Sequence, residues 1–214
     1  VFTLAHEMGH AMHTYYSNKT QPITYANYLI FVAEVASTCN EALLIRHLLD
    51  QSKDDKEKAY LLNYFLEQFR GTLFRQTMFA EFEKLAHAKS EAGVPLTAEV
   101  LCDIYYDLNK QYFGEDAVVD EEIALEWARI PHFYTPFYVY QYATGFSAAI
   151  AISSKILSGE PGIVEKYKKF LRGGSSLDCI DLLKICDVDM TTKEPVEEAL
   201  KVFEKTLEEF SKII

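Results

Sequence analysis

The chain has 214 residues, of which 49% are hydrophobic, so it can bury a sizeable core as one large domain or two small ones. Its formal net charge of −11 argues against nucleic acid or an anionic membrane as its main partner. The four cysteines are scattered without a C-x-x-C pair, and no apolar run reaches the roughly 18 residues of a membrane span. We therefore expect reduced, buried thiols and a cytoplasmic protein.

Amphipathic segments separated by short breaks predict an all-α fold. Caps and Gly or Pro stops indicate helices at about residues 1–16, 26–49, 53–91, 97–114, 120–129, 135–159, 161–171, 178–186 and 194–214. Gly71 is expected to bend the third, and Thr135 with Pro136 to begin the sixth. We interpret residues 1–214 as a single helical catalytic portion. Because the first helix opens on Val1 without a cap, we expect the natural protein to be longer.

The first predicted helix carries His6-Glu7-Met8-Gly9-His10, the pattern H-E-x-x-H. At about 100° per residue, His6 and His10 lie about 40° apart on one stripe, so both rings can bind one zinc ion. Glu7 lies one residue round the helix, where it can act as base on a metal-activated water. The apolar neighbours predict a buried helix, and Gly9 predicts the close approach of another backbone or a ligand. Two histidines on a helix face without metal are the alternative.

A zinc site of this type needs a third protein ligand and leaves the fourth position to water. A histidine six residues after His10 is absent, since Tyr16 stands there. Glu34 is the better candidate, because an acid inside an apolar helix should be paired or metal-bound. Glu41, on the same face, could orient a ligand histidine, although either glutamate could instead form an ordinary salt bridge. His13 is expected beside the site or facing substrate, with direct ligation as the alternative.

These residues, with a glutamate 28 positions after the first histidine, resemble the oligoendopeptidase F and thimet-oligopeptidase family of zinc peptidases. The resemblance extends to residues 74–83 (FRQTMFAEFE), 131–134 (PHFY), 137–145 (FYVYQYATG), 173–176 (GGSS) and 181–184 (DLLK). It implies a zincin-type helical domain that forms one wall of a deep peptide channel. It also implies endopeptidase action on short peptides and an N-terminal remainder that forms the other wall. Cys186-Asp187 departs from the family, where we expect a small residue and then Gly.

The segment after Pro131 offers donors for the oxyanion of a peptidase transition state. A tyrosine hydroxyl stays protonated at neutral pH and can donate, and Tyr138 and Tyr142 lie one helical turn apart. The resemblance implies a His and Tyr pair in this region. We therefore predict catalytic roles for His132, Tyr138 and Tyr142, with ordinary core packing of a Tyr-rich helix as the alternative.

The predicted function is a zinc-dependent endopeptidase for short oligopeptides, with one Zn²⁺ per chain held by His6, His10 and Glu34 and with Glu7 as general base. The alternative is a non-catalytic zinc-binding helical module that binds peptides or partners. Arg75 and Arg129 could clamp a peptide carboxylate, but ordinary helix-surface charges are the simpler interpretation. Nucleic acid and membranes are not expected as partners.

Overall fold

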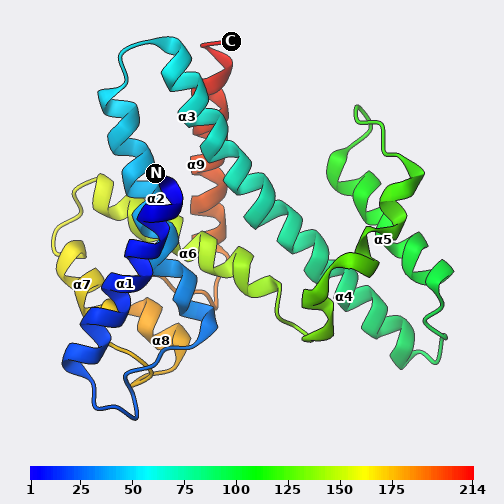
Figure 1. Ribbon diagram of the computed structural model, residues 1–214, viewed down its shortest axis with the longest axis horizontal. Helices are drawn as coiled ribbons and strands as arrows, with labels where there is room; N and C mark the ends of the chain where they lie inside the picture. Colours follow the sequence, from blue (N-terminus) through cyan, green and yellow to red (C-terminus); the bar gives the residue numbers. More distant parts are fainter. The chain divides into compact units, whose positions relative to one another are not determined.

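The computed structural model describes all 214 residues and contains helices and loops without a strand, which confirms the predicted all-α class (Figure 1). In chain order the α-helices are α1 Phe2–Thr20, α2 Ile30–Gln51, α3 Asp55–Gln68, α4 Arg75–Glu91, α5 Ala98–Phe113, α6 Tyr140–Leu157, α7 Ile163–Leu171, α8 Cys179–Lys184 and α9 Glu194–Ser211. A π-helix, η1 (Phe69–Phe74), follows α3, and two 3-10 helices, η2 (Glu121–Arg129) and η3 (Pro131–Tyr134), precede α6. None of the helices combines the length and the apolar character that crossing a membrane requires.

The helices form two compact units. Unit 1 comprises Val1–Arg70 and Thr144–Ile214, and unit 2 comprises the intervening Gly71–Ala143. The chain passes from unit 1 to unit 2 within η1 and returns within α6. That residues 1–214 act as one catalytic portion stays a prediction.

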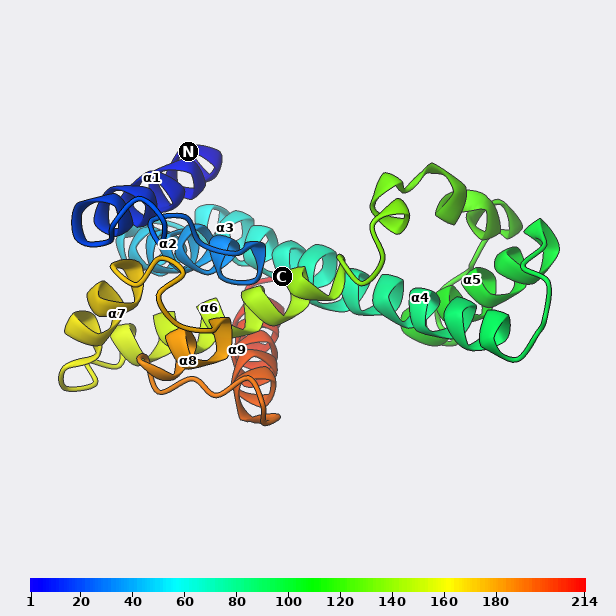
Figure 2. The ribbon, with the colours of Figure 1, turned by 90° about the horizontal axis from the view of Figure 1, so that it is seen from below.

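Helices α1 and α2 pack against each other unusually closely at Gly9 (Figures 1 and 2). A Cβ atom built on Gly9 would lie 2.5 Å from Ser37 Cα and 2.8 Å from the Ala36 carbonyl oxygen. The Asn40 side chain also donates a hydrogen bond of 2.6 Å to the Ala5 carbonyl. The prediction that Gly9 permits a close backbone approach is therefore confirmed, and the approaching backbone is that of α2.

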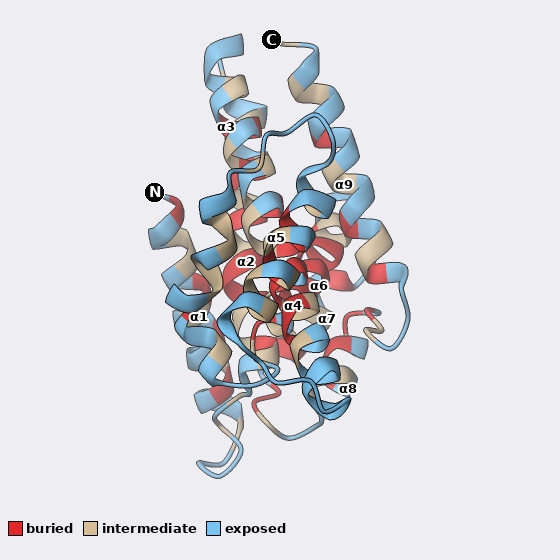
Figure 3. Cartoon of the chain, turned by 90° about the vertical axis from the view of Figure 1, so that its right-hand side faces the viewer, coloured by how far each residue is buried: buried red, intermediate tan, exposed pale blue.

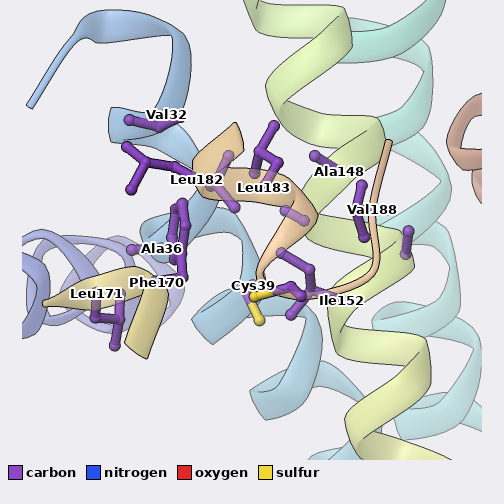
Figure 4. Close-up of a cluster of buried hydrophobic side chains, with 14 of the residues drawn as sticks. Val32, Ala36, Cys39, Ala148, Ile152, Phe170, Leu171, Leu182, Leu183 and Val188 are labelled. Carbon is purple, nitrogen blue, oxygen red and sulfur yellow. The ribbon is translucent and has the colours of Figure 1, made fainter. Parts of the chain in front are cut away.

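The opposite side of α2 lies in the main hydrophobic core of unit 1. Figure 4 shows this cluster, in which α2 meets α6, α7, α8 and the loop that follows α8. Its labelled members are Val32, Ala36, Cys39, Ala148, Ile152, Phe170, Leu171, Leu182, Leu183 and Val188. Burial raises the pKa of the Cys39 thiol to about 12, so this free thiol stays uncharged and packs as a small apolar group. The core thus holds α2 in place.

The outer face of α1 is exposed, so these 214 residues do not bury the first helix on all sides as expected (Figure 3). Val1, Leu4 and Met8 are 88%, 68% and 49% exposed. The buried residues of α1 (Phe2, Gly9, His13 and Ser17) instead lie on one stripe. Apolar composition indicated burial on all sides, but α2 and α7 cover only one side of this helix.

In unit 2, α4 and α5 pack around the buried aromatic side chains of Phe79, Phe82 and Tyr105. Two predicted helices differ from the structure in their bounds. The segment 53–91 divides into α3, η1 and α4, with the π-helix around Gly71. Helix α6 starts at Tyr140 and not at 135, because the backbone of Phe137 has φ 57°, which a right-handed helix cannot contain.

The departure at Cys186-Asp187 also has a conformational explanation. Asp187 has φ 55°, in the left-handed region that favours glycine. Aspartate tolerates this region better than most residues, and the Asp187 carboxylate forms an ion pair with Lys166. The position therefore has the backbone conformation that the expected glycine would suit.

We predict that Gly9→Ala lowers the free energy of unfolding by about 2 kcal/mol, because the new methyl group has to separate the α1 and α2 backbones. Chemical denaturation measures the effect. Gly71→Ala is the control, since a Cβ there meets nothing within 4 Å. Equal unfolding free energies for Gly9→Ala and the unaltered protein would contradict the close packing.

Candidate metal centre

Three predicted ligands meet where α1 lies against α2. His6 and His10 come from successive turns of α1, and Glu34 comes from the second turn of α2. Glu34 Oε2 lies 3.3 Å from His6 Nε2 and 3.6 Å from His10 Nε2. One ligand atom from each of the three residues lies within 4.8 Å of the others. The structure therefore brings together all three residues of the predicted metal site.

Neighbouring polar side chains contact two of the three predicted ligands, His6 and Glu34. Glu41 Oε1 lies 3.4 Å from His6 Nδ1, and Gln68 Nε2 donates a hydrogen bond of 3.0 Å to Glu41 Oε2. The Ser37 hydroxyl donates to Glu34 Oε2 at 3.1 Å. Burial raises the pKa of the Glu41 carboxyl, and the neighbouring His6 opposes this shift. Glu41 thus occupies the place of a carboxylate that orients a ligand histidine.

The chemistry of this donor set fits a divalent metal ion. Two imidazole nitrogens and one carboxylate oxygen are a ligand combination of catalytic zinc sites. The His6, His10 and Glu34 side chains are 27%, 28% and 27% exposed, so their ligand atoms remain accessible from solvent. A site with this access can leave a coordination position for water or substrate.

Glu7 and His13 lie on different sides of α1. Glu7 is exposed to solvent beside His6. His13 is only 1% exposed, and its ring stacks on Tyr28 at a centroid distance of 3.7 Å. Burial, assisted by His10, lowers the pKa of His13 to about 4, so this ring is neutral. The expectation that His13 faces substrate is therefore wrong, because it packs in the interior.

The predicted oxyanion donors form a cluster within unit 2. The His132 ring stacks on Tyr138 at 5.6 Å and meets the Tyr142 ring edge-on at 5.9 Å. The Tyr138 and Tyr142 hydroxyl oxygens are 3.4 Å apart. The structure thus brings His132, Tyr138 and Tyr142 together, and their catalytic role stays a prediction.

Arg75 and Arg129, considered as clamps for a peptide carboxylate, both form ion pairs with Glu126 of η2. Tyr105 donates a hydrogen bond of 2.6 Å to the same carboxylate. Although burial opposes it, the Tyr105 hydrogen bond and the two guanidinium groups lower the pKa of Glu126. These contacts favour a structural role for both arginines.

Glu83, a buried carboxylate of unit 2, was not among the residues predicted from the sequence. Its side chain is 6% exposed and accepts a hydrogen bond of 2.9 Å from the Phe137 backbone N–H. Glu81 and Lys84 are charged neighbours on the same helix, so the local sequence does not distinguish Glu83 from a solvent-exposed acid.

An all-α fold whose H-E-x-x-H helix meets a glutamate of the next helix defines a metallopeptidase-like class of protein. The model of the Peptidase family M3 matches residues 1–202. The chain belongs to this family.

Individual relatives agree with the family assignment. The chain is 58% identical over 214 residues to oligopeptidase PepF from Bacillus subtilis (strain 168), covering 100% of the chain and 32% of the relative. It is 46% identical to the chromosomal oligoendopeptidase F of Lactococcus lactis subsp. cremoris, covering 100% of the chain and 36% of that relative. The crystal structure of oligoendopeptidase-F from Enterococcus faecium superposes with a TM-score of 0.89 at 47% identity, over 99% of this chain and 38% of that one. The chain thus spans about a third of the length of the curated relatives it matches.

We expect Glu34→Ala to abolish retention of a divalent metal on dialysis, since it removes one of three ligands. Glu41→Gln should retain the metal with an affinity about 10-fold lower, because it weakens only the support of His6. Elemental analysis and competition with a chelator measure both effects. Unchanged metal content in Glu34→Ala would move the third ligand elsewhere.

Proposed function

We propose that this chain is the metal-binding catalytic portion of a zinc endopeptidase that cleaves short oligopeptides. The observation that carries the proposal is the geometry of the metal centre, where His6, His10 and Glu34 converge and Glu7 lies exposed beside them. The family and the oligopeptidase names of the relatives support peptide hydrolysis as the reaction. They also support short peptides as the substrate class.

His6, His10 and Glu34 would hold one zinc ion. Zinc bound there would lower the pKa of a water molecule toward 7 and polarise the scissile carbonyl. Glu41 would keep the His6 ring oriented through Nδ1, so that Nε2 points to the metal.

Glu7 would serve as the general base and then as the general acid. Its exposed carboxylate adjoins His6 and can accept a proton from the attacking water as the new C–O bond forms. The same carboxyl group would then give this proton to the leaving amine as the C–N bond breaks. Glu7 therefore ends each cycle in the ionised state in which it began.

His132, Tyr138 and Tyr142 would donate hydrogen bonds to the substrate and to the oxyanion that develops on the scissile carbonyl. Their mutual packing supports this role, because stacked rings with neighbouring hydroxyls are held in one arrangement. Each tyrosine would donate through its hydroxyl hydrogen.

A non-catalytic zinc-binding module is the second candidate. A purely structural zinc site is closed by four ligands and needs no base beside it. The three-residue donor group and the exposed Glu7 favour the catalytic interpretation.

We predict that Glu7→Gln keeps zinc in the intact protein but lowers kcat by about 10²–10⁴-fold, because glutamine cannot take the proton. Cleavage of a quenched-fluorescence peptide and elemental analysis measure the two properties. Glu198→Gln, an exposed substitution on α9, is the matched control. Full turnover by zinc-loaded Glu7→Gln would eliminate Glu7 as the base.

For the aromatic cluster, Tyr138→Phe should lower kcat by about 10²-fold with unchanged zinc content, because it removes one donor and keeps the ring. Tyr106→Phe is the control, since it also removes one hydroxyl of unit 2, which donates to the Val119 carbonyl. If both variants had the same kcat, Tyr138 would have no part in the chemistry.

A further inference from the structure

Phe137 has a backbone conformation that its own side chain does not favour. Its φ of 57° lies in the left-handed region, which bulky L-residues rarely adopt. Its ring is 56% exposed, so burial of this side chain does not explain the conformation. Strained residues of this kind persist only where surrounding contacts hold them, and they concentrate at functional sites.

Two residues of α4 supply such contacts. The Glu83 carboxylate accepts the Phe137 N–H at 2.9 Å, and Glu83 is itself 6% exposed. One turn further along, the His87 ring stacks on the Phe137 ring at 4.8 Å with an interplanar angle of 28°. Helix α4 therefore contacts both the backbone and the ring of Phe137.

The residue after Phe137 is Tyr138, whose ring stacks on His132 with an interplanar angle of 18° and whose hydroxyl lies 3.4 Å from that of Tyr142. The φ angle of Phe137 sets the direction in which the chain enters Tyr138. A relaxed, negative φ would turn the Tyr138 peptide and carry its ring out of this arrangement. The hydrogen bond between Glu83 and the Phe137 N–H can therefore affect the cluster of His132, Tyr138 and Tyr142 through the backbone conformation of Phe137.

We propose that Glu83 is a positioning residue, which holds Phe137 in the left-handed conformation and thereby keeps Tyr138 in its arrangement with His132 and Tyr142. This inference rests on the proposed function of Tyr138. The role of Glu83 requires only an acceptor oxygen at this place. Glutamine should therefore replace it, whereas leucine, of similar size, should not.

The first test is amide hydrogen exchange of Phe137 in the intact, metal-loaded protein. We expect exchange at least 10-fold faster in Glu83→Leu and in the smaller Glu83→Ala, and a rate within 3-fold of the unaltered protein in Glu83→Gln. Glu81→Leu is the matched control, because this α4 carboxylate accepts from Tyr112 and not from Phe137. Unchanged Phe137 exchange in a folded Glu83→Leu or Glu83→Ala variant would overturn the proposal.

The second test follows the effect to catalysis. Glu83→Leu should lower kcat at least 10-fold with unchanged zinc content, and Glu83→Gln should keep kcat within 3-fold. In a Tyr138→Phe background, Glu83→Leu should lower kcat by less than 3-fold, because its action runs through Tyr138. An undiminished effect there, or equal losses for Glu83→Gln and Glu83→Leu, would contradict positioning. An unaltered kcat in Tyr138→Phe alone would refute the role proposed for Tyr138, while hydrogen exchange would still decide whether Glu83 holds Phe137.

Discussion

The candidate metal centre depends on how closely two helices can approach each other. The backbone of α2 passes Gly9 at a distance that leaves no room for a Cβ atom. This contact lies between the two histidines of α1 and brings the Glu34 carboxylate to within 3.6 Å of each. A glycine in mid-helix weakens the isolated helix, but it removes the side chain that would otherwise separate the ligands. Gly9 therefore lowers the helix propensity of α1 at one position, and its missing side chain makes the ligand geometry possible.

Much of this centre could be predicted because its determinants are local. The spacing of His6 and His10 places both rings on one stripe of any α-helix. Glu34 is conspicuous as an acid within an apolar helix that a short loop joins to the first. The exposure of α1 could not be predicted in this way, because apolar composition does not show on which sides a helix has neighbours. The expectation that His13 faces substrate failed for the same reason, since its stripe continues from the metal site into the core.

The parts that sequence analysis missed depend on contacts between distant residues. Thr135 and Pro136 resemble the start of a helix, but the conformation of Phe137 delays that start to Tyr140. Phe137 is held by Glu83, which lies 54 residues earlier in the chain. Arg75 and Arg129 likewise converge on Glu126, an acid with no distinguishing local pattern. Tertiary contacts of this kind override local propensity and leave little trace in the sequence around them.

The division of unit 1 into two chain segments has a consequence for how the protein is made. The three metal ligands precede Gly71–Ala143 in the chain, whereas the α6 side chains that cover the other side of α2 follow it. A chain still being synthesised therefore exposes both histidines and the glutamate before α2 has its apolar support. The complete unit must wait until all of Gly71–Ala143 has left the ribosome. The apolar support of the helix that carries Glu34 is therefore complete only after α6 has been synthesised, although all three ligands precede α6 in the chain.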